Sequence, residues 1–190
     1  MYETKDKILV IALTLFARDG YEGVSMKDIA DQLNISKAAL YKHYDSKKDI
    51  FDNIILLMND KNKKKVNDFN NNLSLNKIKD FSMMMYKYWT EDKMASNFRK
   101  MLTLEQYRNP KMASLLNEYL MGGIIGNAQT VINKYSSKIN NYDSNVLALE
   151  YFSVIYMLMN MYDQKYDKKK LLIMLETHID YFMEKFIDEK

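Results

Sequence analysis

Proline occurs once in this chain, at position 110, and glycine occurs five times among 190 residues. Both residues are disfavoured inside helices, because proline lacks an amide N–H and glycine loses the most backbone entropy on ordering. No alternating run of Val, Ile or Thr is bounded by the Asn-Gly or Asp-Gly turns that are typical of β-hairpins. With 47% hydrophobic residues available for a core, the sequence predicts an all-α protein.

Several function classes are excluded by the residues that the chain lacks. Cysteine is absent, which excludes disulfides, thiolate catalysis and cysteine-based zinc sites. The two histidines, His43 and His178, are far apart, and neither a metal-ligand spacing nor a glycine-rich phosphate loop occurs. We therefore expect no catalytic residue, no metal and no cofactor, and we predict that the protein is not an enzyme. His178 lies on an apolar helix face and is predicted to be packed and hydrogen-bonded.

Two apolar segments resemble membrane-directed sequences but are better explained as helices of a cytoplasmic protein. The N-terminal run is interrupted by Thr14, and Arg18 and Asp19 stand where small residues would mark signal-peptide cleavage. Residues 146–162 are apolar nearly all round, but this segment is short for a membrane span and contains Glu150. We predict that it is a helix buried on every side, and we expect no membrane contact.

Three closely spaced serines each occupy a position that can cap a short helix. Ser25 is followed three residues later by Asp28, a capping-box arrangement, while Ser36 and Ser46 precede the next two helices. Asn34 tolerates positive φ and can form the tight turn between the first two. Helices this short need tertiary packing, so they must lie on the amphipathic helix predicted over 4–19. Residues 1–50 thus predict a three-helix bundle with a helix-turn-helix, a DNA-binding layout.

The case for DNA depends on where charges point, because residues 1–50 carry eight basic and eight acidic side chains. Leu40 and Tyr44 are expected to anchor residues 36–44 to the core, which leaves the opposite face outward. Small alanines there permit close approach to base edges, lysines can donate to guanine, and hydroxyl groups and helix starts can contact phosphate. Taken singly, these side chains can also be plain surface residues. The predicted contacts are Ser25, Lys27, Ser36, Lys37, Ala38, Ala39, Tyr41, Lys42, His43 and Lys47.

Residues 51–190 are predicted to form a larger helical domain for regulation and dimerisation. A long helix beginning after Ser46 ends in lysine-rich residues 61–65, which we interpret as a solvated helix end rather than a DNA contact. The following helices are expected at 75–90, 94–107, 110–136, 143–163 and 168–188. The last helix carries one apolar stripe, formed by Leu171, Leu175, Ile179, Phe182 and Phe186. Its simplest cover is the same pair of helices in a second copy, so we predict a homodimer through the last two helices.

The same region predicts a plastic apolar pocket for a small-molecule effector, because the chain contains 15 methionines and 15 tyrosines. Ordinary helix packing is the alternative explanation for each of these side chains. Glu105 can meet a cationic ligand, pair with Arg108 or face water. The candidate ligand-binding residues are Met85, Tyr86, Trp89, Met101, Glu105, Tyr107 and Met121.

The segment ILVIALTLFARDGYEGVSMKDIADQLNISKAALYKHYDSKKDIFDNII resembles the N-terminal domain of the tetracycline-repressor (TetR) family of bacterial transcription regulators. The family usually has glycine in place of Asn34 and phenylalanine in place of Tyr44. The resemblance implies an all-helical homodimer that binds a palindromic double-stranded DNA operator and releases it when a small molecule binds the C-terminal domain. The alternatives are an architectural or partner-controlled DNA-binding regulator without a small-molecule ligand, and a helical enzyme or lipid-binding scaffold.

Overall fold

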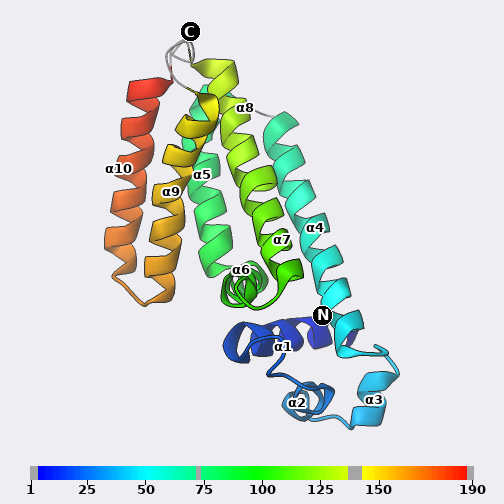
Figure 1. Cartoon of the computed structure of the whole chain (residues 1–190). Coiled ribbons are helices and arrows are strands. Elements are labelled where there is room, and N and C mark those ends of the chain that lie inside the picture. Colours follow the sequence, from blue (N-terminus) through cyan, green and yellow to red (C-terminus); the bar gives the residue numbers. More distant parts are fainter. Residues whose placement is uncertain (1–3, 72–73, 137–142, 188–190) are drawn as a thin grey trace. The chain divides into compact units, whose positions relative to one another are not determined.

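The computed structural model describes residues 4–71, 74–136 and 143–187 of the chain (Figure 1). Every regular element within these ranges is helical, which confirms the predicted all-α class. None of the described helices is both long enough and apolar enough to cross a membrane.

Packing divides the chain into two compact units, each built from two stretches of sequence. Unit 1 consists of Met1–Asn71 and Asp92–Ala113, and unit 2 consists of Asn72–Glu91 and Ser114–Lys190. The predicted functional boundary at residue 50 stays a prediction. The packing units are divided differently because a helix from the middle of the chain packs on the first helix.

Unit 1 is organised around its first helix. Its helices are α1 (Thr4–Asp19), α2 (Met26–Gln32), α3 (Lys37–Tyr41), α4 (Lys47–Asn71) and α6 (Lys93–Glu105). α1 packs against α2, α4 and α6, and α2 packs against α3. Ile8, Ala12 and Phe16 of α1 recur at helical spacing and are completely buried, so one face of α1 supplies the centre of this core.

The local signals in residues 20–46 act as predicted. The Ser25 hydroxyl accepts from the Asp28 N–H and the Asp28 carboxylate accepts from the Ser25 N–H, which completes the capping box. Ser36 caps α3, and Asn34 has φ of +55° in the turn between α2 and α3. The third helix ends at Tyr41 rather than near residue 44, because the following N–H groups, including that of His43, bond back to the Leu40 carbonyl and close a turn.

Unit 2 contains the remaining helices. They are α5 (Leu75–Glu91), α7 (Pro110–Asn117, whose first turn belongs to unit 1), η1 (Glu118–Ile125), α8 (Gly126–Tyr135), α9 (Ser144–Asp163) and α10 (Lys168–Phe186). The helix predicted over 110–136 is therefore present, but its middle is wound as a π-helix. This widened segment contains two glycines, which weaken regular α-helical winding.

The last two helices differ from the prediction in which faces they bury. The stripe of α10 that was expected to meet a second copy is covered within the chain, where α10 packs on α5 and α9 and leaves Leu171, Leu175 and Ile179 with no exposed surface. α9 is not buried on every side, since Leu149 is 52% and Met157 is 61% exposed. Periodicity cannot distinguish these faces, because both are apolar.

A polar cluster joins α5, α9 and α10 inside unit 2. The hydroxyl groups of Ser82 and Tyr151 lie 2.5 Å apart, and burial raises the pKa of Tyr151 to about 12. The His178 ring stacks on the Tyr151 ring, and His178 Nε2 lies 2.8 Å from the Tyr151 carbonyl oxygen. His178 is thus packed and hydrogen-bonded, as predicted.

Tyr151 makes the stability of the protein sensitive to alkaline pH. Its pKa is raised above the ordinary value of 10.0, so the unfolded chain loses this proton first as the pH rises. The free energy of unfolding should therefore fall between pH 10 and 12 by about 2–3 kcal/mol more than in a Tyr151→Phe variant. Urea titrations at pH 8, 10, 11 and 12 measure this difference. Parallel pH profiles for the two proteins would contradict the assignment.

Candidate nucleic-acid interface

The α2–turn–α3 segment is held on α1 by a few buried side chains. Ile29 and Ala30 of α2 are 0% and 1% exposed, and the Ala30 carbonyl accepts from the Ile35 N–H across the turn at 3.0 Å. Among the five residues of α3, Leu40 is the one that is buried. With Tyr44 also buried, the remaining side chains of this short helix stay available on its other faces, as predicted.

The start of α2 combines an exposed hydroxyl with an exposed ammonium group. Hydrogen bonds from the Ser25 hydroxyl and then from the Ser25 N–H hold the pKa of Asp28 below its ordinary value. Lys27 Nζ lies 2.6 Å from Asp31 Oδ2, and this ion pair raises the pKa of Lys27. Both groups of this pair are largely solvated, so an approaching phosphate can exchange for the carboxylate at little cost.

Most of the predicted contact residues of α3 and its ends are accessible. Lys42 is exposed, and no described side chain forms an ion pair with it. Lys37 lies over the ring of Tyr41 at 5.7 Å, which holds two polar tips together on one side of the helix. The exposed residues are Ser36, Lys37, Ala38, Tyr41 and Lys42, and the half-buried ones are Ala39 and His43.

Lys47 is less free than the sequence suggests. Its side chain is 22% exposed, and Nζ donates to the Tyr21 carbonyl oxygen at 2.8 Å while lying 4.3 Å from the centre of the Tyr21 ring. Glu22 Oε2 is also 3.6 Å away. The predicted phosphate contact of Lys47 stays a prediction, and it must operate with this ammonium group already bound to the loop between α1 and α2.

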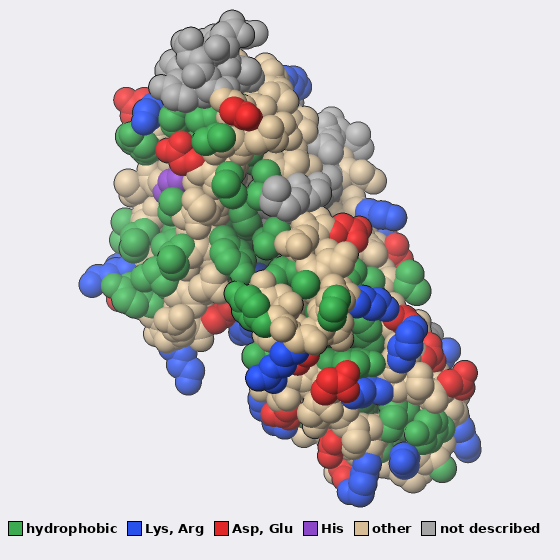
Figure 2. Space-filling model, viewed as in Figure 1, with side chains coloured by type: hydrophobic (Ala, Val, Ile, Leu, Met, Phe, Trp, Pro, Cys, Tyr) green, Lys and Arg blue, Asp and Glu red, His purple; other side chains and the backbone are tan. Residues whose placement is uncertain are grey.

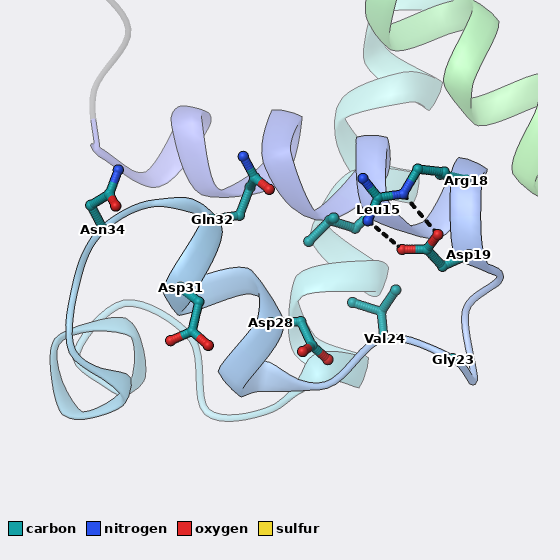
Figure 3. A pocket seen from close by; sticks show the side chains of 9 residues that line it. All are labelled: Leu15, Arg18, Asp19, Gly23, Val24, Asp28, Asp31, Gln32 and Asn34. Atoms are coloured by element: carbon teal, nitrogen blue, oxygen red, sulfur yellow. Dashed lines mark hydrogen bonds and ion pairs between the residues drawn. The ribbon is translucent and has the colours of Figure 1, made fainter.

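A pocket of about 480 Å³ lies between the end of α1 and α2 (Figure 3). Asp19, Asp28 and Asp31 contribute carboxylates to its wall, and Arg18 is occupied by two hydrogen bonds to Asp19. Carboxylates repel phosphate, so this pocket is not suited to the DNA backbone. In the described part of the chain, no group of three or more acidic or histidine side chains is arranged to hold a metal ion.

A second pocket of unit 1, of about 410 Å³, is lined by residues of α1, α2, α4 and α6. Neither of these two pockets contains any of the seven predicted ligand-binding residues. The lining residues of this second pocket are Lys7, Val10, Ile11, Gln32, Leu33, Lys61, Asp92, Lys93 and Met94.

The predicted ligand-binding residues fall into both units. Met85, Tyr86 and Trp89 belong to α5 in unit 2, where the last two are buried and Met85 is half-buried. Met101, also buried, belongs to unit 1.

Two further candidates for the ligand site are Tyr107 and Met121. Tyr107 is 88% exposed, so it does not line a cavity, because the α6–α7 turn turns it outward. The side chain of Met121 lies outside the described residues.

Glu105 has a role that its sequence context did not reveal. It neither faces water nor pairs with Arg108, since it is 2% exposed and its Oε1 accepts from the Tyr21 N–H at 3.1 Å. The two residues are 84 positions apart, and no local pattern connects them. The one available signal was a single acidic residue on an otherwise apolar face of a predicted helix.

The sequence matches to known proteins lie in the region of the helix-turn-helix. Residues 8–54 match the family of bacterial regulatory proteins named tetR. The negative transcriptional regulator IcaR of the biofilm operon icaADBC, from Staphylococcus aureus strain Newman, is 54% identical over 48 residues. These residues are 25% of this chain and 26% of IcaR, so the match spans about a quarter of that relative's length.

Two solved structures share the fold over nearly the whole chain. A transcriptional regulator from Aquifex aeolicus VF5 superposes with a TM-score of 0.73 at 19% identity, covering 94% of this chain and 99% of that one. The ketosteroid transcriptional regulator KstR2 of Mycobacterium tuberculosis also gives 0.73, at 14% identity, covering 100% and 97%. Residues 8–54 thus match the tetR family of bacterial regulatory proteins, and the chain as a whole shares the fold of these two solved regulators.

Proposed function

We propose that the protein is a sequence-specific DNA-binding transcriptional repressor whose reading element is α3. The observation that carries this proposal is the exposed face of a helix-turn-helix that Leu40 and Tyr44 anchor to the core. On this face Lys42 has no ion-pair partner among the described residues, and Ala38 and Ala39 precede it by one helical turn. IcaR, a relative that matches this segment, is a negative transcriptional regulator, which supports repression rather than activation of transcription. The predicted contacts from Ser25 to Lys47 divide into two groups. Contacts to base edges are assigned to Lys37, Ala38, Ala39 and Lys42, and contacts to phosphate to Tyr41, His43 and the residues at helix starts.

The dimer in this proposal forms through α9 and α10, but by faces other than the stripe first expected. Exposed apolar side chains recur along both helices at helical spacing, and Figure 2 shows hydrophobic side chains at the surface over them. A two-fold dimer would place two α3 helices in successive major grooves, about 34–36 Å apart. The exposed apolar residues are Val146, Leu149, Val154, Met157, Ile173, Met174 and Tyr181.

The effector in this proposal is an apolar small molecule that binds in unit 2. Tyr86 and Trp89 lie in an aromatic environment there, with ring contacts to Tyr162 and Tyr119 respectively. A ligand that favours a dimer with the wrong spacing between reading helices would shift the population off the operator. KstR2, a ketosteroid regulator of the same fold, supports an apolar class of effector.

A mobility-shift titration tests the DNA-binding part of the proposal. The probe is the duplex upstream of the gene for this chain, with a scrambled duplex of equal length as competitor. Retardation of the first probe at moderate salt, resistant to the competitor, is the expected result. Equal affinity for both duplexes would leave a nonspecific architectural protein as the better description.

Replacing Lys42 with alanine should relax base preference without unfolding the protein. Because Lys42 is exposed and has no described ion-pair partner, its removal leaves no buried group unsatisfied. The expected loss is about 1–3 kcal/mol on the preferred operator and much less on duplexes altered at the contacted base pair. Lys63→Ala, which removes another exposed lysine, is the matched control. A uniform loss across all duplexes would instead assign Lys42 to a phosphate contact.

A further inference from the structure

Glu105 is a buried carboxylate at the last residue of α6. It is 2% exposed, and removing a charged group from water is costly unless hydrogen bonds compensate. Its Oε1 accepts from the backbone N–H of Tyr21 at 3.1 Å, in the loop that joins α1 to α2. A carboxylate that accepts from an N–H forms a charge-assisted bond, stronger than a bond between neutral groups.

The loop is shaped to admit this carboxylate. Gly20 has φ of +81°, a conformation that favours glycine, and it ends α1. A β-carbon at Gly20 would lie 2.6 Å from Glu105 Oε1, closer than such contacts permit. The backbone conformation thus favours glycine at position 20, and any other side chain would also push the Glu105 carboxylate from its place.

Tyr21 is held from its other end by the first residue of α4. Its carbonyl oxygen accepts from Lys47 Nζ at 2.8 Å, and its ring lies between those of Phe16 and Phe51, with centroids at 5.2 and 5.1 Å. One residue thus connects a carboxylate of α6 to a lysine at the start of α4. All of these groups belong to unit 1.

We propose that Glu105 is a positioning residue for DNA binding. By accepting from the Tyr21 N–H, it fixes the backbone of Tyr21, whose carbonyl oxygen in the next peptide binds Lys47. The inference rests on the proposed function, since it assigns Lys47 a phosphate. Glu105 itself is buried and does not touch DNA. An ammonium group has three N–H donors, so the bond to Tyr21 leaves Lys47 donors for a phosphate oxygen. Without the Glu105 acceptor, the peptide between Gly20 and Tyr21 loses its hydrogen bond. The ring of Tyr21 stays packed, but the direction of its carbonyl oxygen, and with it the position of Lys47, is less firmly set.

A double-mutant cycle tests this connection. The proteins are wild type, Glu105→Leu, Lys47→Ala and the double variant, and fluorescence anisotropy gives their affinities for the duplex upstream of the chain's own gene. E105L should weaken binding about tenfold, the size expected for one hydrogen bond to a charged group. K47A should reduce the slope of log affinity against log salt by about one, and E105L should reduce it in the same direction.

The decisive comparison is made in the background that lacks Lys47. If Glu105 acts through Lys47, the double variant should bind within about twofold of K47A alone. A further tenfold loss in the double variant, or wild-type affinity and salt slope in E105L, overturns the inference. A wild-type protein without sequence-specific affinity would instead contradict the proposed function, so the two failures are distinguishable.

Two more variants separate positioning from folding. Glu91→Leu makes the same substitution at an exposed carboxylate and should leave affinity and salt slope unchanged. Glu105→Gln keeps an acceptor oxygen and removes the charge, so it tests the inference even if E105L does not fold. It should weaken binding by about two- to threefold in wild type and not measurably in the K47A background. An equal loss in both backgrounds refutes the connection.

Discussion

Replacing Met157 with arginine is expected to convert the proposed dimer into a monomer that no longer retards operator DNA. Met157 lies on the apolar face of α9 with 61% of its surface exposed in the single chain. A two-fold interface would bury this position and its copy together, and an unpaired buried charge on each side is strongly unfavourable. The dimer dissociation constant should rise by about 100-fold or more, measured by sedimentation equilibrium.

The loss of DNA affinity should be larger than any single contact can explain. A dimer binds its second half-site as an intramolecular event, which raises the affinity by a factor of roughly 10²–10⁴. A monomer loses this gain. Leu56→Arg is the matched control, because Leu56 has the same 61% exposure but lies on α4. M157R should retain its helical circular dichroism. A variant that stays dimeric, or a wild type that is monomeric at micromolar concentration, would exclude this interface.

Replacing Leu40 with alanine is expected to be the most destabilising change in the reading element. Leu40 is 0% exposed and is the buried residue of a helix of five residues, which cannot persist without tertiary packing. The free energy of unfolding should fall by about 2–5 kcal/mol, a large share of the 5–15 kcal/mol typical of a domain. Urea titration monitored by far-ultraviolet circular dichroism measures this loss of stability.

The neighbouring residue separates stability from recognition. Tyr41 is 43% exposed, so Tyr41→Ala should change the free energy of unfolding by less than about 0.5 kcal/mol. We expect Y41A to weaken DNA binding while leaving stability intact, whereas L40A reduces both. If L40A unfolds like wild type, α3 is anchored by residues other than Leu40 and its assigned orientation is wrong.

The helix-turn-helix could be predicted almost residue by residue because its signals are local. A serine hydroxyl caps an N–H within three residues, as Ser25 and Ser36 do, and positive φ at Asn34 and Gly20 depends on the residue itself. The helix boundaries beyond residue 74 were also close to the prediction, since they depend on apolar periodicity and on Pro110 at a helix start. The ligand site could not be predicted to the same degree, as the exposure of Tyr107 shows.

Local patterns in the residues are enough to predict that the chain is helical, where its short helices begin, and which residues of α3 are free to face outward. Which apolar face of α9 and α10 is covered depends on packing in three dimensions, because both faces are apolar and only the neighbouring helices select one. The same holds for the hydrogen bond from Lys47 to the Tyr21 carbonyl oxygen and for the buried Glu105, which accepts from the Tyr21 N–H. These contacts join residues far apart in the chain, and the energies that select them come from packing and desolvation rather than local backbone preference.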